Sequence, residues 1–191
     1  KGKWRFLLFD MDVTLGRHPW TLATENALFT RMDKYTGRNT FVNIINAFLD
    51  NREFFNLFMN RHQDLFNTKF ESDSLSQAFE EFIDIVDREM VHHFERWPAH
   101  SYLDWSTRRT DKIRDFIDER PFYATKYMDE FYDLGGSYLL TVKSDNVDGG
   151  LIRLNTLENI NSGFQGKYFK KVPVRLIATP EVGFYFSHWQ I

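Results

Sequence analysis

The sequence contains no cysteine, and this absence excludes disulfide bonds, thiolate nucleophiles and zinc–thiolate centres. No apolar run approaches the roughly 20 residues that a membrane-spanning helix needs. A net charge of −3 gives no electrostatic basis for binding nucleic acid or an anionic membrane surface. Globular enzymes and protein-interaction domains therefore remain as the open classes.

Aromatic residues are abundant: 20 phenylalanines contribute to an aromatic content of 17% in a chain of 191 residues. This length suits one sizeable core, or one domain with a small appendage. The apolar content of 42% and the charged content of 27% are typical of globular proteins. We expect the aromatic side chains to pack a helical core.

A helical pattern predominates from about residue 25 to residue 134. Apolar residues recur at a spacing of three and four residues. In the segment 51–67 this spacing places Phe54, Phe58 and Leu65 on one face, with Leu57 alongside. The pattern predicts helices over 51–67, 72–97 and 104–119, and a last helix with Pro121 in its first turn that ends near residue 134.

The pattern changes at Gly135–Gly136, where short apolar or alternating runs replace the helical spacing. The runs are "YLLTVKS", "GGLIRLN", "VPVRLIATP" and "GFYFSHW", and turn-forming residues separate them. They predict a small all-β module over 135–191 that follows a helical domain over 1–134. We expect Trp189 to be buried against its strands, on the same side as Phe184 or Phe186, because residues two apart share a strand face.

Two aspartates follow a short apolar run near the start of the chain. Residues 4–10 are predicted to form a buried strand that ends at Asp10, and residues 11–24 a loop that contains Asp12 and Thr14. Such a pair serves two chemistries. In one, the first aspartate is a phosphatase nucleophile and the second its acid–base partner; in the other, both hold Mg²⁺ against a nucleotide. A third possibility is structural, with one aspartate capping the loop and the other facing solvent.

The phosphatase alternative has a sequence resemblance. "LLFDMDVTL" resembles the first motif of the haloacid dehalogenase superfamily, which implies that Asp10 is phosphorylated during catalysis. That fold requires strands that alternate with helices, whereas residues 25–134 have a helical pattern. Val13 also stands where that family usually has glycine.

A second resemblance covers more of the chain. "KWRFLLFDMDVTLG" closely resembles the CotH family of atypical kinases, named for a spore-coat protein, and Leu15 replaces the usual aromatic residue. The resemblance continues through "FMNRHQDLFNTKF", "EMVHHFERWP" and "IRDFIDERPFYATKYMDEF", and so covers about residues 1–134.

The CotH resemblance implies a mainly α, C-lobe-like region of an atypical kinase fold with a short N-terminal strand. It implies phosphoryl transfer from ATP to protein hydroxyls, with Asp10 and Asp12 as the Mg²⁺ and nucleotide ligands. The nucleotide-clamping lysine and the catalytic-loop aspartate of that family precede such a strand. We therefore expect the sequence to be the C-terminal part of a longer chain, with its catalytic residues upstream of Lys1, and to be inactive by itself.

Other residue groups have ordinary structural interpretations. Arg61 and Asp64 are predicted either to brace the metal-binding loop or to tie helices together. Three histidines suggest zinc, but no carboxylate–histidine spacing supports such a site. Three tryptophans suggest sugar stacking, although burial is the favoured interpretation. These residues are His92, His93 and His100, and Trp97, Trp105 and Trp189.

The tail resembles the small secreted β repeats of bacterial surface proteins, through its Gly-x-Tyr-Phe turn and its Gly-Phe-x-Phe-x-x-Trp ending. This resemblance implies an extracellular or cell-envelope location in a bacterium. The implied partner is a protein substrate or an envelope or coat protein. It also leaves open a non-catalytic scaffold or adhesion protein of the bacterial surface or spore coat.

Overall fold

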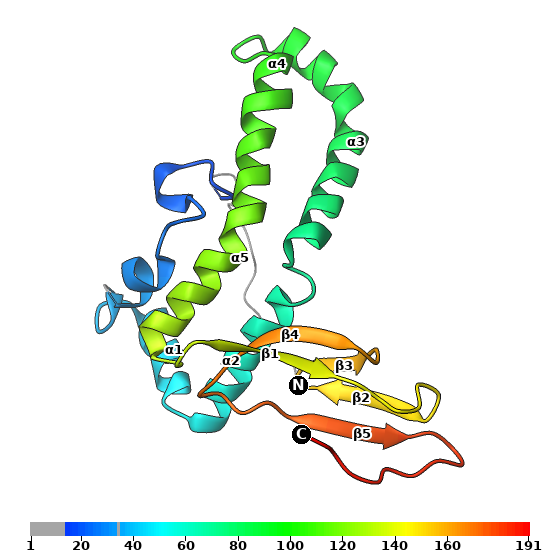
Figure 1. The fold of residues 1–191 in the computed structure, drawn as a ribbon. Helices are drawn as coiled ribbons and strands as arrows, with labels where there is room; N and C mark the ends of the chain where they lie inside the picture. Colours follow the sequence, from blue (N-terminus) through cyan, green and yellow to red (C-terminus); the bar gives the residue numbers. More distant parts are fainter. Residues whose placement is uncertain (1–13, 34) are drawn as a thin grey trace, which may run out of the picture. The chain divides into compact units, whose positions relative to one another are not determined.

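The computed structural model describes residues 14–33 and 35–191 (Figure 1). The predicted strand at residues 4–10 and the aspartates Asp10 and Asp12 lie outside the described residues. The chain packs as two compact units. The first contains the described residues up to Glu25 together with 72–123, and the second contains 26–71 together with 124–191.

The first unit is built from long helices. Its elements are the 3-10 turn η1 (Pro19–Thr21), α3 (Ser72–Arg96), α4 (Tyr102–Asp104), the π-helical turn η3 (Trp105–Arg109) and the first part of α5 (Thr110–Tyr132). The helix predicted over 72–97 is thus confirmed as α3. The helices predicted over 104–119 and from Pro121 onward are wrong as separate elements, because α5 runs through Pro121 without a break.

A side chain from α3 explains how α5 accommodates proline. Pro121 has no N–H, so the carbonyl of Ile117 loses its usual helical partner four residues on. The hydroxyl of Ser72 donates to this carbonyl oxygen at 3.2 Å. The helix therefore continues with one hydrogen bond supplied from the start of α3.

The second unit combines short helices with the β segment. Its helices are the π-helical turn η2 (Leu28–Asp33), α1 (Thr40–Leu49), α2 (Arg52–Phe66) and the end of α5. Asn39 and Asn51 cap α1 and α2, because each side-chain oxygen accepts hydrogen bonds from two backbone amides of the first turn. The helix predicted over 51–67 is thus confirmed as α2.

The β segment forms two small antiparallel sheets. The strands are β1 (Ser137–Val142), β2 (Gly150–Leu154), β3 (Leu157–Ile160), β4 (Phe164–Phe169) and β5 (Leu176–Pro180). β1 pairs with β4, and β2 lies between β3 and β5. A helical region followed by a small β region confirms the predicted fold class. The division into domains at residue 134 stays a prediction.

The β segment shares its core with α2 and the end of α5. One buried cluster lies among the strands: Val142, Ile152, Leu154, Ile160 and Tyr168. A second joins the strands to the helices: Met59, Met128, Leu134, Phe169 and Val172. The second cluster places the face of α2 that carries Met59 against the β segment.

The buried face of α2 differs from the predicted one. Leu57 and Phe58 are 55% and 36% exposed, whereas Asn60, Gln63 and Asp64 are buried beside Met59. Polar groups are favoured here because α2 lies against the backbone of β4, which offers donors and acceptors. Gln63 donates to the carbonyl of Lys167, and burial of such a group costs little once it is hydrogen-bonded.

Asp64 is the centre of this polar contact and is 0% exposed. Its carboxylate accepts hydrogen bonds from the Tyr168 hydroxyl at 2.8 Å and from the backbone N–H and hydroxyl of Thr156 at 2.9 and 2.6 Å. Burial, together with the charge of Asp64, raises the pKa of Tyr168 above its ordinary value. A Cβ at Gly166 would lie 2.9 Å from the side-chain nitrogen of Asn67, so α2 can approach β4 this closely only at glycine.

The last run of the chain is not a strand. Residues 181–191 have no ladder partner among the described strands, and the aromatic residues of "GFYFSHW" are exposed. Trp189 is 37% exposed, and Phe184 and Phe186 are 46% and 44% exposed. The predicted burial of Trp189 is therefore wrong; its ring contacts Phe186, with ring centroids 5.1 Å apart.

Candidate functional site

The segment that follows the aspartate pair turns sharply. Leu15 and Gly16 both have positive φ angles, of 55° and 75°. Two backbone hydrogen bonds close the turn, from Arg17 N–H to the Thr14 carbonyl at 3.2 Å and from Gly16 N–H to the Thr21 carbonyl at 3.0 Å. In its described part, from Thr14 to Thr24, the segment is the predicted loop with one short 3-10 turn.

Helix α5 holds this loop at both ends. A Cβ built on Gly16 would meet Phe116 and the Lys112 carbonyl at 3.4–3.5 Å. At the other end, the Arg120 guanidinium donates to the carbonyls of Ala23 and Glu25, each at 2.8 Å. The position of the loop is therefore set by α5.

A larger side chain at Gly16 is expected to destabilise the first unit. Gly16→Leu must hold a left-handed backbone, at a cost of about 1–2 kcal/mol, and must displace Phe116, at about 1–3 kcal/mol more. Gly37→Leu is the matched control, because Gly37 also has φ of 75° but has nothing within 4 Å of its Cβ position. Chemical denaturation followed by tryptophan fluorescence measures both variants. Equal losses would show that the contact with Phe116 contributes nothing.

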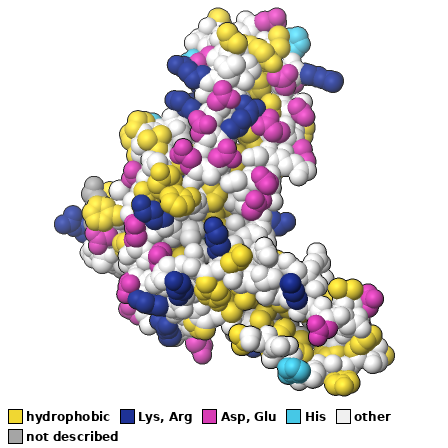
Figure 2. Space-filling model, viewed as in Figure 1, with side chains coloured by type: hydrophobic (Ala, Val, Ile, Leu, Met, Phe, Trp, Pro, Cys, Tyr) yellow, Lys and Arg dark blue, Asp and Glu magenta, His cyan; other side chains and the backbone are white. Residues whose placement is uncertain are grey.

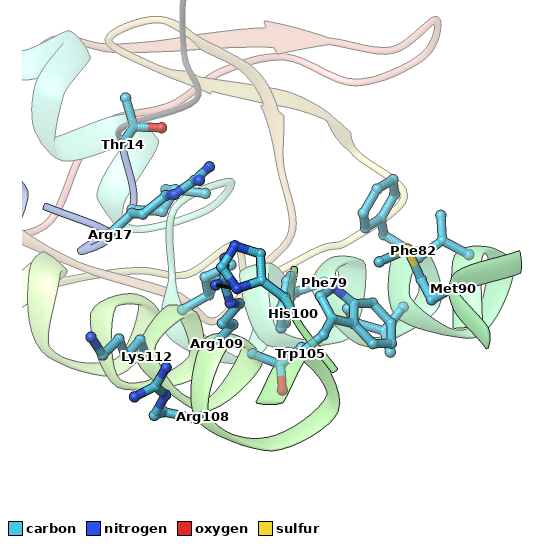
Figure 3. A pocket seen from close by; sticks show the side chains of 15 residues that line it. Thr14, Arg17, Phe79, Phe82, Met90, His100, Trp105, Arg108, Arg109 and Lys112 are labelled. Carbon is cyan, nitrogen blue, oxygen red and sulfur yellow. Dashed lines mark hydrogen bonds between the residues drawn. The ribbon is translucent and has the colours of Figure 1, made fainter. Parts of the chain in front are cut away.

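The loop borders a groove between α3 and α5, with a volume of about 810 Å³ (Figure 3). One end is apolar and is formed by Phe79, Phe82, Ile83, Val86, Met90 and Trp105. The other end carries the basic side chains Arg17, Arg108, Arg109 and Lys112, together with Thr14 and His100. No aspartate or glutamate lines the groove among the described residues.

The carboxylate of Asp104 holds two of the basic side chains in place. Asp104 forms ion pairs with Arg108 at 2.6 Å and with Arg109 at 2.7 Å. The hydrogen bond from Arg109, followed by the one from Arg108, holds the pKa of Asp104 below its ordinary value. The charged carboxylate keeps both guanidinium groups at the rim of the groove.

Lys112 is exposed, as Arg108 is, and it forms no ion pair with another described residue. Trp105, Arg109 and Ile113 are four residues apart, as are Arg108 and Lys112. This spacing places a basic and apolar stripe on one side of the helical segment. That spacing is a sequence signal for the groove, whereas Trp105 was grouped with Trp97 and Trp189 in the prediction.

The described residues contain no group of three or more histidine or acidic residues that could hold a metal ion. His92 lies 3.4 Å from Glu95, and His100 contacts Arg109, so the histidines do not converge. The predicted magnesium ligands Asp10 and Asp12 lie outside the described residues.

Arg61 and Asp64 have a different role from either predicted one. Both bond to Thr156 of the β segment, Arg61 at 2.9 Å. These two side chains connect α2 to the β segment and do not connect two helices. The predicted burial is also wrong for Trp97, which is 59% exposed, whereas Trp105 is half-buried at the groove.

Comparison with known protein families decides between the two family resemblances. Residues 1–124 match the family model described as CotH kinase protein. The chain belongs to the CotH kinase family. A search of curated proteins and a search of solved structures found no match. Among the described residues the sheets are antiparallel, so this part of the chain lacks the parallel sheet that the phosphatase fold needs.

No helix among the described residues is long and apolar enough to cross a membrane. The CotH match ends within α5, and the β segment from Ser137 onward lies outside it. The resemblance of that segment to secreted β repeats stays a prediction.

Proposed function

We propose that this CotH-family chain forms the metal-binding end of a kinase site that transfers phosphate from ATP to protein hydroxyls. Asp10 and Asp12 hold Mg²⁺ together with the nucleotide phosphates. The observation that carries the proposal is the family match, which spans the Asp-x-Asp motif and the helices that follow it.

The donor chemistry supports a magnesium site. Mg²⁺ prefers carboxylate oxygens and is usually bound by one or two carboxylates plus substrate phosphates. Two aspartates one residue apart supply that donor set, and the metal, when bound, neutralises the charge of the transferring phosphate. Asp10 is the first choice of ligand, because the end of the predicted strand would fix its position.

The described residues hold the loop that follows the Asp-x-Asp motif. Gly16 packs on α5, and Arg120 fixes the end of the loop, so the segment that leaves the aspartate pair has a set path. Arg17 and Lys112 place positive charge on the side of the groove where Thr14 lies (Figure 3). Positive charge near the motif favours a polyphosphate or an acidic substrate over a cationic one.

Nucleotide binding tests the proposal directly. The protein is expected to bind ADP or ATP in the presence of Mg²⁺ and not in the presence of EDTA, as measured by calorimetry. Asp10→Asn should weaken this binding about tenfold or more, because it removes a charged ligand at nearly constant size. Asp118→Asn on the exposed side of α5 is the control. Equal Mg²⁺-dependent binding by wild type and Asp10→Asn would contradict the proposal.

The proposed location is the outside or the envelope of a bacterial cell, and the proposed acceptor is a protein of that compartment. This part rests on the resemblance of residues 135–191 to secreted repeats. Fractionation of the native host, followed by detection with an antibody, tests it. Recovery of the protein in the cytoplasmic fraction alone would contradict it.

A further inference from the structure

The tail of the chain (residues 181–191) presents aromatic side chains that the buried core does not use. Tyr185 is 87% exposed, and Phe184, Phe186 and Trp189 are exposed as well. None of the four belongs to either buried cluster of the β segment. Apolar side chains that remain exposed together mark a binding surface.

These rings border a hollow of about 710 Å³ in the β segment. The tail turns back after β5 and forms one side of the hollow (Figure 1). The connection between β1 and β2 forms another side, and strand residues form the floor. Figure 2 shows hydrophobic side chains gathered on the visible face of the β segment, with few charged ones among them. Sites for small molecules span about 300–1,000 Å³, so the hollow has the size of such a site.

The floor consists of strand side chains and not of a free strand edge. Thr141 of β1 lies opposite Gln165 of β4. Leu151 of β2 likewise lies opposite Thr179 of β5. Residues opposite each other in a ladder project on the same face, and all four line the hollow. A ligand on this floor therefore meets hydroxyl, amide and apolar side-chain groups, whereas an added peptide strand would need the backbone groups of an edge.

Hydrogen bonds hold the sides of the hollow in place. The backbone N–H of Ser144 donates to the hydroxyl of Ser162 at 2.9 Å. The backbone N–H of Glu181 donates to the carbonyl of Gly149 at 3.0 Å, which fixes the start of the tail to the β1–β2 connection. A Cβ built on Gly149 would lie 3.5 Å from the ring of Phe184. The hollow is therefore formed before a ligand arrives, and this lowers the entropic cost of binding.

The lining carries almost no net charge. Lys143 and Asp145 are the ionised side chains among the lining residues that the structure describes, apart from any charge on His188, and their charges cancel. Gln165 and Gln190 form no side-chain hydrogen bond with another described residue, and each amide can both donate and accept. An ionic ligand would gain no net attraction here, whereas hydroxyl groups of a ligand find both donors and acceptors.

From these observations we infer that the hollow binds a neutral saccharide. A pyranose ring has an apolar face of C–H groups and a rim of hydroxyls. Its C–H face stacks on Trp189 and Tyr185, because the face of an aromatic ring is negative and C–H hydrogens carry partial positive charge. Its hydroxyls exchange hydrogen bonds with Gln165 and Gln190. The inference is independent of the proposed kinase function, since all these residues lie outside the CotH match.

Two neutral hexasaccharides provide the test, cellohexaose and chitohexaose, whose rings expose apolar C–H faces. Calorimetry with the whole chain should show binding of at least one of them with a Kd of about 1 mM or lower. The Kd should change little when the salt concentration is raised, because salt screens only interactions between charges.

Variants of the protein assign this binding to the hollow. Trp189→Ala and Tyr185→Ala should each weaken it about tenfold or more. Gln165→Ala should weaken it about threefold to tenfold, as expected for the loss of one hydrogen bond. Trp97→Ala is the matched control, because Trp97 is an exposed tryptophan outside the hollow. None of the four variants removes a buried side chain, so circular dichroism should show unchanged folding.

Several outcomes would overturn the inference. One is the absence of binding of both saccharides at about 10 mM. Another is an equal effect of Trp189→Ala and Trp97→Ala, or binding that salt abolishes. Sedimentation that shows a dimer of the wild type and a monomer of Trp189→Ala would assign the rings to a second copy of the chain. Binding of an extended apolar peptide without binding of either saccharide would assign the hollow to a protein partner.

Discussion

Asp64→Ala is expected to lower the free energy of unfolding of the second unit by about 3–5 kcal/mol. The substitution leaves the Tyr168 hydroxyl and the Thr156 amide without an acceptor, and each buried unpaired donor costs about 1–3 kcal/mol. Circular dichroism in increasing urea, together with amide hydrogen exchange of β4, measures the effect on this unit. Asp50→Ala, at an exposed aspartate of the same unit, is the control and should change little.

Conservative variants separate the parts of this network. Asp64→Asn keeps the shape, but its NH₂ group replaces one of two oxygens that both accept hydrogen bonds, so the loss should be intermediate. Tyr168→Phe leaves the Thr156 contacts intact and should cost less, about 1–2 kcal/mol. A loss below 1 kcal/mol for Asp64→Ala would show that water replaces the carboxylate at low cost.

The pH dependence of the wild type follows from the same contact. The folded state raises the pKa of Tyr168 above its unfolded value of about 10.0. The folded state therefore holds the phenolic proton more tightly, and stability falls as the pH rises above 10. Tyr168→Phe removes one such group, and Tyr132 and Tyr138, whose pKa values burial also raises, remain. The stability of the variant should therefore be less sensitive to pH in this range, but not insensitive.

Asp10→Asn is expected to lower ATP-dependent phosphorylation by the whole protein by about 10³-fold or more, while the fold stays intact. The reason is that a metal ligand at the transferring phosphate contributes several kcal/mol of transition-state stabilisation, and each 1.36 kcal/mol is a factor of ten. Transfer of radiolabelled phosphate from ATP to acceptor proteins is the measurement. Asp12→Asn should have the same effect or a somewhat smaller one, and Asp118→Asn is the control.

Two results would contradict this expectation. Full activity of Asp10→Asn would exclude the aspartate as a metal ligand. Covalent phosphorylation of Asp10 by a small phosphate ester would support a phosphatase nucleophile instead. Proper folding of the variant, checked by circular dichroism, would show that a loss of activity comes from the site.

The sequence predicted the positions of α2 and α3 well, because apolar spacing and capping residues are local properties. The predictions were wrong where the structure of a segment depends on a residue that is distant in sequence. Pro121 was predicted to begin a helix because the residue that lets α5 continue through it is distant in sequence. The hydroxyl of Ser72, which donates to the Ile117 carbonyl, is 49 residues before Pro121. The apolar face of α2 was predicted instead of its polar face, because the partner of the polar face, β4, lies about 100 residues later.

The strand predicted at the end of the chain was also wrong. The alternation in "GFYFSHW" is the pattern of a strand, but a strand also needs a ladder partner. Residues 181–191 have none among the described strands, although β5 lies at the edge of its sheet. The groove was missed because its two ends come from α3 and from the start of α5, and the cationic residues gain meaning only beside Phe82 and Trp105. The family resemblance was confirmed because it rests on several motifs that need no tertiary contact.

The contact between Asp64 and Tyr168 joins residues 104 positions apart, and this separation has a consequence for biosynthesis. Ribosomes add about 5–20 residues per second, so α2 leaves the exit tunnel roughly 5–20 s before β4 can reach it. During that interval Asn60, Gln63 and Asp64 remain hydrated, and Met59 has no cover from Phe169. The second unit therefore completes its fold only after β4 has been synthesised, and α2 is open to a nascent-chain chaperone during that interval.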